Sequence, residues 1–233
     1  MKKLFIIAAM AVAGITTANA QEFKVGAKAG FLMSNVSVNS SSYIEAGKLI
    51  TSKLNTAFRP GFHFGAFIEY GFNEKIWVEA GVDYAFQGAK LKSVEATVIN
   101  VSDGSLFASE KANIKNGWLK TQQFNIPLWV KYDISGFRPK VGVNLGFLSK
   151  VKGNLEIEGG SAVENKSLTP DKKFDFGLGF GAEYNLPMGL FFDATFNLGL
   201  TKLSTKEKNN DGTYSEGGKF KNRVIQIGVG YKF

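Results

Sequence analysis

The chain contains no cysteine, only 5 prolines and a single histidine among its 233 residues. Without cysteine it has neither a disulfide framework nor a thiol for a lipid anchor, so its stability must come from the fold itself. After the first twenty residues there is no uncharged apolar run of about 18 residues, the length that a membrane helix needs. The mean hydropathy is −0.05. These absences exclude a disulfide scaffold and a protein held in a membrane by helices.

The distribution of charge bears on nucleic-acid binding. The formal net charge is +8, from 28 basic and 20 acidic residues, and it falls to +6 when Lys2 and Lys3 are set aside. The basic residues are scattered along the chain and form no single patch in the sequence. Nucleic-acid binding therefore gains little support from the positive charge.

The first twenty residues form a unit of their own. Lys2 and Lys3 are a basic head, residues 4–15 are an apolar run, and Ala18-Asn19-Ala20 is an A-x-A cleavage site. This pattern predicts a secretory signal peptide over residues 1–20, which is too short for a membrane helix. The mature chain, residues 21–233, has a length that suits one domain.

The C-terminal stretch shows the organisation of the rest. In residues 223–233, apolar Ile225, Ile227, Val229, Tyr231 and Phe233 alternate with polar or small residues, as in a strand with one apolar face. A long strand at the end of a soluble protein would leave an open sheet edge, whereas a closed barrel pairs the last strand with the first. Similar alternation predicts strands at residues 22–35, 58–70, 76–87, 118–132, 140–147, 174–184 and 190–200.

These strands are joined alternately by long polar segments and short turns. The long segments are residues 36–57, 89–117, 148–173 and 204–222, which we expect to be loops. Outer-membrane barrels of bacteria have even strand numbers, long external loops and short periplasmic turns. We therefore predict an all-β, eight-stranded, antiparallel, up-and-down transmembrane β-barrel. Pro127 lies in the middle of a predicted strand, where we expect a bulge.

Alternation alone does not decide which face is outside, because a lipocalin-like carrier has its apolar residues inside. The strands are long enough to cross the hydrocarbon, and their apolar faces are nearly free of charge. A tyrosine ends four strands near a short turn or the terminus, as in an interfacial girdle: Tyr70, Tyr132, Tyr184 and Tyr231. Outward apolar faces leave a charged network in the lumen, formed by Lys24, Lys28, Arg59, His63, Glu69, Glu79, Asp83, Lys131, Lys140, Asp175, Glu183, Asp193 and Lys232.

The mature chain resembles a known family over essentially its whole length. Three of the predicted strands carry the motifs of this resemblance. Residues 123–132 (QFNIPLWVKY) resemble the "IPL…KY" strand of the outer-membrane β-barrel domain family that includes PorT-like proteins, small barrels of the OmpA/OmpX type. Residues 174–184 (FDFGLGFGAEY) and 197–200 (NLGL) are similar to two further strands of that family. Thr195-Phe196 stands where we expect the family's Arg-Tyr, which predicts one different lumenal pairing. The resemblance implies a barrel and names no single function.

Catalytic and ligand-binding patterns are weak. His63 faces the predicted lumen, where Glu79 and Asp83 are conceivable partners for a base, but a structural hydrogen-bonding role is the simpler interpretation. Asn209-Asn210-Asp211-Gly212 lacks the rest of an EF-hand and reads as a turn. Gly177, Gly179 and Gly181 lie in an alternating strand and do not form a phosphate loop. We expect no enzyme activity, cofactor or metal.

The sequence therefore predicts an integral protein of the outer membrane of a Gram-negative bacterium. Its expected role is structural or interaction-based, with external loops that bind a protein or small molecule. A narrow channel, a PorT-like secretion or assembly factor and a soluble lipocalin-like carrier remain alternatives. The expected partners are outer-membrane lipid and the barrel-assembly machinery, for which Tyr231 and Phe233 form the terminal aromatic signal.

Overall fold

The computed structural model describes residues 22–38, 40–160, 162–208 and 214–233, almost all of them in strands. None of the described residues lies in a helix that is long and apolar enough to span a membrane. The predicted signal peptide lies outside the described residues. The elements in chain order are β1 (Glu22–Val38), β2 (Ser41–Glu45), β3 (Lys48–Gly71), β4 (Ile76–Asn100), β5 (Leu106–Tyr132), β6 (Phe137–Ile157), β7 (Ala162–Pro170), β8 (Phe174–Asn185), β9 (Leu190–Gly199), β10 (Leu203–Lys208) and β11 (Tyr214–Lys232).

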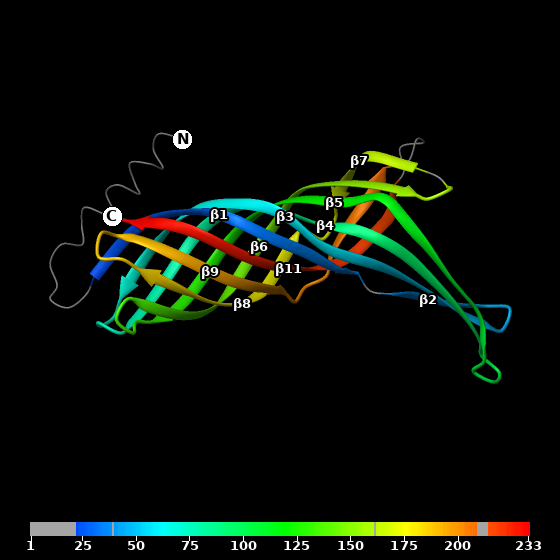
Figure 1. Cartoon of the computed structure of the whole chain (residues 1–233), viewed down its shortest axis with the longest axis horizontal. Coiled ribbons are helices and arrows are strands. Elements are labelled where there is room, and N and C mark those ends of the chain that lie inside the picture. The colour runs from blue at the N-terminus through cyan, green and yellow to red at the C-terminus, as the bar shows by residue number, and fades with distance from the viewer. Residues whose placement is uncertain (1–21, 39, 161, 209–213) are drawn as a thin grey trace.

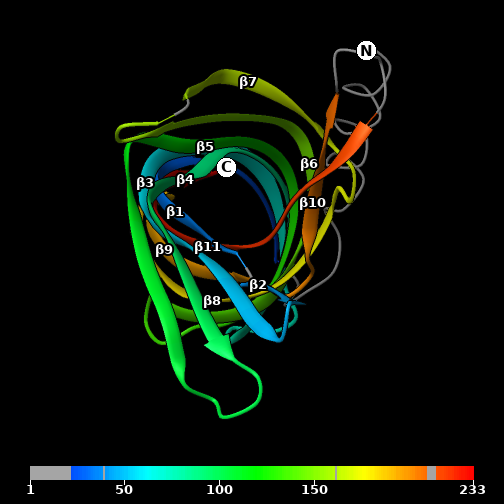
Figure 2. The ribbon, with the colours of Figure 1, turned by 90° about the vertical axis from the view of Figure 1, so that its right-hand side faces the viewer.

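Eight of these strands form a closed ring in the order β1, β3, β4, β5, β6, β8, β9 and β11 (Figures 1 and 2). All neighbours are antiparallel, and β11 returns to β1 through pairs that run from Gly26–Lys232 to Val38–Phe220. The ring confirms the predicted eight-stranded barrel and its closure by the C-terminal strand. Because every ring strand is paired on both sides, the barrel has no open edge along the closed part.

The apolar face of the ring points outward. Phe31 and Ile227 are 80% and 65% exposed, whereas Glu69 on the opposite face has no exposed surface. An exposed band of this kind would be costly in water and suits the hydrocarbon of a membrane. The inverted, lipocalin-like arrangement is therefore wrong.

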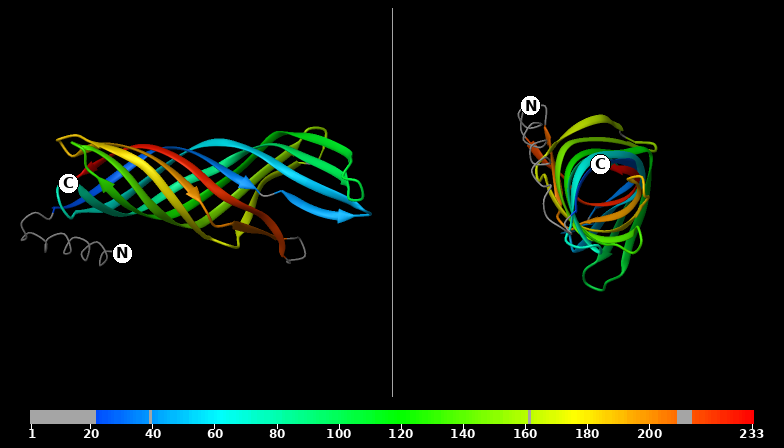
Figure 3. Two further views of the ribbon diagram at one scale, coloured as in Figure 1. Left: turned by 90° about the horizontal axis from the view of Figure 1, so that it is seen from below. Right: turned by 90° about the vertical axis from the view of Figure 1, so that its left-hand side faces the viewer.

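The strands are longer than predicted at one end of the barrel. The short turns lie where the sequence places them, but residues 48–57, 88–100 and 106–117 continue as strands instead of loops. The β3–β4 and β4–β5 ladders run up to Lys48–Asn100 and Ile99–Leu106. Outside a membrane, a strand needs no apolar outer face, so polar residues there do not interrupt pairing. The short strand β2 pairs with residues 48–52 of β3. At the same end of the barrel (Figure 3), β7 pairs with residues 151–156 of β6 and β10 with residues 214–220 of β11, so the loops expected over residues 148–173 and 204–222 also contain strands.

The expected bulge at Pro127 is also wrong. The β4–β5 ladder has the same register on either side, from Ala80–Leu128 to Asp83–Asn125, and Pro127 itself pairs with Asn144 of β6. The register shifts lie farther along the strands, for example between Lys90 and Ser93. Proline is accommodated because it lacks only the backbone N–H, which would have donated to one of the two neighbouring strands.

Candidate functional site: the barrel lumen

The half of the lumen near the short turns holds a charged network (named here the ion-pair layer). Lys131 is its hub, with Nζ at 2.5 Å from Glu79, 2.6 Å from Glu183 and 3.7 Å from Glu69. The side chains of all four residues have at most 1% of their surface exposed. A charge so deeply buried is tolerated only when it is paired, so the hub depends on its carboxylates.

Strands far apart in the sequence complete this layer. Lys232 of β11 lies 2.7 Å from Glu69 and 2.6 Å from Glu183, and Arg138 of β6 lies 2.5 Å from Glu69. Arg138 also contacts Asp133 in the turn before β6. Further pairs are Lys28 with Glu79 at 2.8 Å and Lys140 with Asp193. Each ring strand contributes at least one member to the ion-pair layer, namely Lys28, Glu69, Glu79, Lys131, Arg138, Lys140, Glu183, Asp193 and Lys232.

Aromatic rings fill the space between these charges. Arg138 lies 4.1 Å from the centre of the Trp77 ring, and Lys140 lies 4.8 Å from that of Trp129. Gly179 faces Trp129, where a Cβ would lie only 2.3 Å from the indole carbon Cη2. The lumen is thus filled by side chains, as expected for a ring of eight strands.

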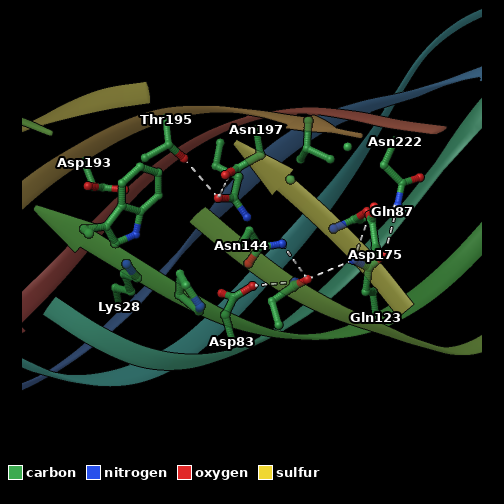
Figure 4. Close-up of a pocket in the computed structure, with 17 residues that line it drawn as sticks. Lys28, Asp83, Gln87, Gln123, Asn144, Asp175, Asp193, Thr195, Asn197 and Asn222 are labelled. Carbon is green, nitrogen blue, oxygen red and sulfur yellow. Dashed lines mark hydrogen bonds between the residues drawn. The ribbon is translucent and has the colours of Figure 1, made fainter. Parts of the chain in front are cut away.

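Next to the ion-pair layer lies a layer of amide side chains with few charges (Figure 4). Asn222 donates to Gln123 Oε1 at 2.9 Å and to Asp175 Oδ2 at 2.8 Å, and Gln123 donates to Asp175 at 3.2 Å. Thr195 donates to Gln226 at 3.0 Å. Thr195 is the position at which we expect an arginine in the family, so a neutral hydrogen bond stands there in this chain. The cavity in this layer has a volume of about 30 Å³. That is room for about two water molecules, not for a continuous water column.

His63 belongs to this part of the lumen. Its Nδ1 lies 2.8 Å from Asp83 Oδ2, and its side chain is 3% exposed. Asn125 donates to the other oxygen of Asp83 at 3.3 Å. Within the described part of the chain, His63 has no hydrogen bond to a hydroxyl nucleophile, so the geometry presents a buried histidine–carboxylate pair.

Beyond the amides, the lumen becomes apolar. Leu32, Ala85 and Val224 form one buried cluster. A second cluster lies farther from the short turns and is formed by Val36, Ala89, Leu148, Val151, Leu203 and Phe220. Charge, amide and apolar layers thus follow one another along the barrel axis, and the last layer is a plug within the extended wall.

Five of the predicted lumenal residues lie outside the ion-pair layer. His63, Asp83 and Asp175 lie in the layer of amide side chains. Lys24 lies at the short-turn rim, 2.9 Å from Glu22. Arg59 lies at the other boundary, in a groove with several lysines. The prediction missed Arg138, because the assigned strand began after it, and the amides Gln123 and Asn222, because a neutral inward residue gives no charge signal.

The predicted tyrosines lie around the short-turn end. Tyr132, Tyr184 and Tyr231 are 45%, 49% and 44% exposed, and Tyr70 packs edge-on against Phe72. Phe233 is 80% exposed beside Tyr231, and its N–H donates to Val25 O at 2.8 Å. Among the described residues, no group of three or more His, Cys, Asp or Glu side chains is placed to hold a metal ion.

The model of the family described as outer membrane protein beta-barrel domain matches residues 5–233. A major outer membrane protein from Thermus thermophilus is 16% identical, with a TM-score of 0.47 over 92% of this chain and 100% of that chain. OprG from Pseudomonas aeruginosa is 15% identical, with a TM-score of 0.45 over 92% of this chain and 97% of that chain. Ail of Yersinia pestis, in complex with the heparin analogue sucrose octasulfate, is 14% identical, with a TM-score of 0.41 over 91% and 99%. A comparison with curated proteins found no match.

Proposed function

Because the chain belongs to the outer membrane protein beta-barrel domain family, we propose that it is a closed barrel whose extended outer end binds partners outside the cell. The short turns then face the periplasm, and the long strand extensions face the exterior. The observation that carries this proposal is the filled lumen. Between the ion-pair layer and the apolar plug the cavity measures only about 30 Å³, which supports a lumen without a continuous column of water.

The test of the closed lumen is conductance. Purified barrel is inserted into a planar lipid bilayer, with a porin of known conductance as the positive control. We expect no discrete current steps from the wild type. Steps that appear with wild-type protein would instead assign the narrow-channel function. Their loss in a variant with a bulkier lumen, such as Gly146→Leu, would confirm that the current flows through this lumen.

The binding surface that we propose is the end of the β2–β3–β4–β5 extension, which projects beyond the rest of the barrel (Figure 1). Its two hairpin tips are joined by a hydrogen bond from Val101 N to Gly47 O at 3.0 Å. Apolar side chains project from this region into solvent, and they are Tyr43, Ile44, Val101, Leu106 and Phe107. Exposed apolar residues grouped outside the lipid-facing band favour a contact with another macromolecule.

Site-specific photocrosslinking in intact cells tests this surface. A photoreactive residue at position 44 is expected to give a discrete protein adduct, whereas one at position 31, in the lipid-facing band, should not. An absence of adducts at positions 44 and 107 would refute the binding role of the tips. Impaired protein secretion in a deletion strain would instead assign the PorT-like role.

We propose that residues 1–20 are removed during export and that the barrel-assembly machinery inserts residues 21–233. The A-x-A pattern at Ala18-Asn19-Ala20 supports this boundary. N-terminal sequencing of the protein from isolated outer membranes should begin at Gln21. A mature protein that begins at Met1 would contradict the proposal.

A further inference from the structure

A basic groove lies on the outer wall, where the lipid-facing band ends. It is lined by Arg59 of β3, Lys90 and Lys92 of β4, and Lys115, Trp118 and Lys120 of β5, together with a few uncharged residues. None of the described residues that line this groove is acidic. Lys115 has an exposed partner, Glu156, at 3.5 Å. The other basic residues therefore repel one another without local compensation.

Strand alternation shows that Lys90 and Lys120 of the groove, and Lys152 of β6 directly beside Lys120, point away from the lumen. Ala89 and Val151 are buried in the apolar plug, so their neighbours Lys90 and Lys152 lie on the outer face. Lys120 lies between Leu119, which packs against the plug, and the buried Thr121. All three lysines are exposed, and no ion-pair partner is present for them among the described residues.

The register places like charges opposite each other. Lys120 of β5 pairs directly with Lys152 of β6, and Lys90 of β4 pairs with Trp118, two residues from Lys120. Directly opposed like charges destabilise a β-ladder. The Lys120 Nζ also lies 4.0 Å from the centre of the Trp118 ring. An arrangement that costs stability in the free protein becomes favourable when an anion lies between the lysines.

The groove lies at the level of the outer membrane boundary. On β5 the outward residues are apolar or aromatic from Tyr132 to Phe124, and Lys120 is the first outward charge beyond them. From Tyr132 to Lys120, a strand tilted by about 45° rises about 28 Å along the membrane normal, close to the hydrocarbon thickness. Lys120 therefore reaches the height of lipid headgroups at the exterior.

Other strands continue the same pattern around the barrel. Exposed basic residues follow the last outward apolar side chain on β6 and β11, at Lys150 and Arg223, and a further exposed lysine, Lys202, lies in the connection between β9 and β10. At the periplasmic rim the charges are mixed, with Lys24 paired to Glu22. The two membrane boundaries thus differ in charge, and the excess of positive charge lies at the outer one.

We propose that this groove binds the phosphate group of an anionic glycolipid in the outer leaflet, with Lys90, Lys120 and Lys152 around the phosphate and Trp118 beside its sugar or upper acyl chain. Ammonium groups neutralise phosphate as point charges, and tryptophan suits the interface between headgroup and hydrocarbon. The site lies on the outer wall, so it is independent of the closed lumen and of the hairpin tips.

Native mass spectrometry of the barrel in detergent, titrated with bisphosphorylated lipid A, tests this site. We expect the barrel to retain lipid A. We expect it not to retain lipid A from which both phosphates have been removed. The Lys90→Gln/Lys120→Gln/Lys152→Gln variant should bind lipid A about tenfold more weakly, from three lost charge-assisted contacts. The matched control Lys53→Gln/Lys75→Gln/Lys111→Gln removes the same charge elsewhere and should bind as the wild type does.

Three outcomes would overturn the proposal, and the first two concern the retention of lipid. One is equal retention of lipid A by the groove variant and the control, and the other is equal retention of the phosphorylated and dephosphorylated lipid by the wild type. Heat-shifted electrophoretic mobility verifies that each variant is a folded barrel. The charge-conserving Lys90→Arg/Lys120→Arg/Lys152→Arg variant should retain binding, and its failure to do so would also contradict the assignment.

Discussion

Replacement of Lys131 by methionine is the sharpest test of the ion-pair layer. Methionine fills a similar volume, so the substitution removes the charge of the hub and leaves little cavity. Three carboxylates, those of Glu69, Glu79 and Glu183, then lose their shared cation at distances of 3.7, 2.5 and 2.6 Å. Each retains another cation, because Lys28, Arg138 and Lys232 are still present.

The expected loss of stability follows from this partial compensation. Removal of one partner from a buried ion pair costs about 3–5 kcal/mol, since an uncompensated charge stays buried. We expect Lys131→Met to lower the free energy of unfolding by an amount in this range. The double variant Glu79→Gln/Lys131→Met has the same net charge in this layer as the wild type, and about 1–3 kcal/mol of that loss should be regained.

Urea unfolding in lipid vesicles measures these effects, with folded barrel quantified by its heat-shifted mobility. Tryptophan fluorescence gives a second signal, because Trp77 and Trp129 lie against Arg138 and Lys140. The control is Lys24→Met. The side chain of Lys24 is 27% exposed and pairs with Glu22, so the loss of its charge should lower the free energy of unfolding by at most about 1 kcal/mol. If Lys131→Met is no more destabilised than Lys24→Met, or if Glu79→Gln regains nothing, the ion-pair layer does not stabilise the barrel.

Three further predictions address packing, assembly and pH. Gly179→Val should lower the free energy of unfolding by about 1–3 kcal/mol, because the new Cβ would collide with the Trp129 ring. Gly153→Ala is the control in the same urea assay and should leave the free energy of unfolding unchanged, because its Cβ would lie 3.6 Å from the nearest atom, Leu168 Cδ1. Deletion of Phe233 removes the terminal aromatic and its hydrogen bond to Val25, and should reduce folded barrel in isolated outer membranes; unchanged amounts would show that assembly ignores this residue. In the turn before β6, burial alone would raise the pKa of Asp133, but hydrogen bonds from Gly136 and Arg138 lower it below its ordinary value. Its stabilising contribution is then present above the unfolded-state pKa of about 3.9 and is lost as the pH falls through the lower folded-state pKa. The stability difference between the wild type and Asp133→Asn should therefore be constant above about pH 5 and shrink below about pH 4; a constant difference down to about pH 2 would contradict this.

Periodicity in the sequence was sufficient to predict the lipid-facing half of the molecule. From Tyr132 to Phe124, outward residues must be apolar and inward residues must be small or polar, so both the strand and its orientation can be read directly. The extensions could not be recognised in this way, because the outer face of residues 88–100 is wet and carries no apolar requirement. Their strand character comes from pairing with neighbours such as residues 106–118, which is a long-range property.

Individual pairings in the lumen were beyond prediction for a related reason. Lys131 and Glu183 are 52 residues apart, and their contact depends on the register of the ladders between β5, β6 and β8. Charge alone marked Lys131 and Glu183 as inward residues, but it did not identify them as partners. Alternation predicted that Arg59 faces the lumen. The β3–β4 register shifts between Phe58 and Phe62, so the alternation of inward and outward residues is interrupted near Arg59.

The distribution of the ion-pair layer over all eight ring strands has a consequence for biogenesis. Lys232 lies on β11, the last ring strand in chain order, whereas its partners Glu69 and Glu183 lie on β3 and β8. A sheet that lacks β11 keeps Glu69 paired with Arg138 and Glu183 paired with Lys131, but both carboxylates lack the second cation, Lys232, and face an unsealed interior. Partial barrels are penalised until the final strand arrives, and the arrival of one ammonium group removes that penalty at the same step that seals the wall. Full pairing of the ion-pair layer and closure of the wall therefore occur in the same step, which makes the closure of the barrel cooperative.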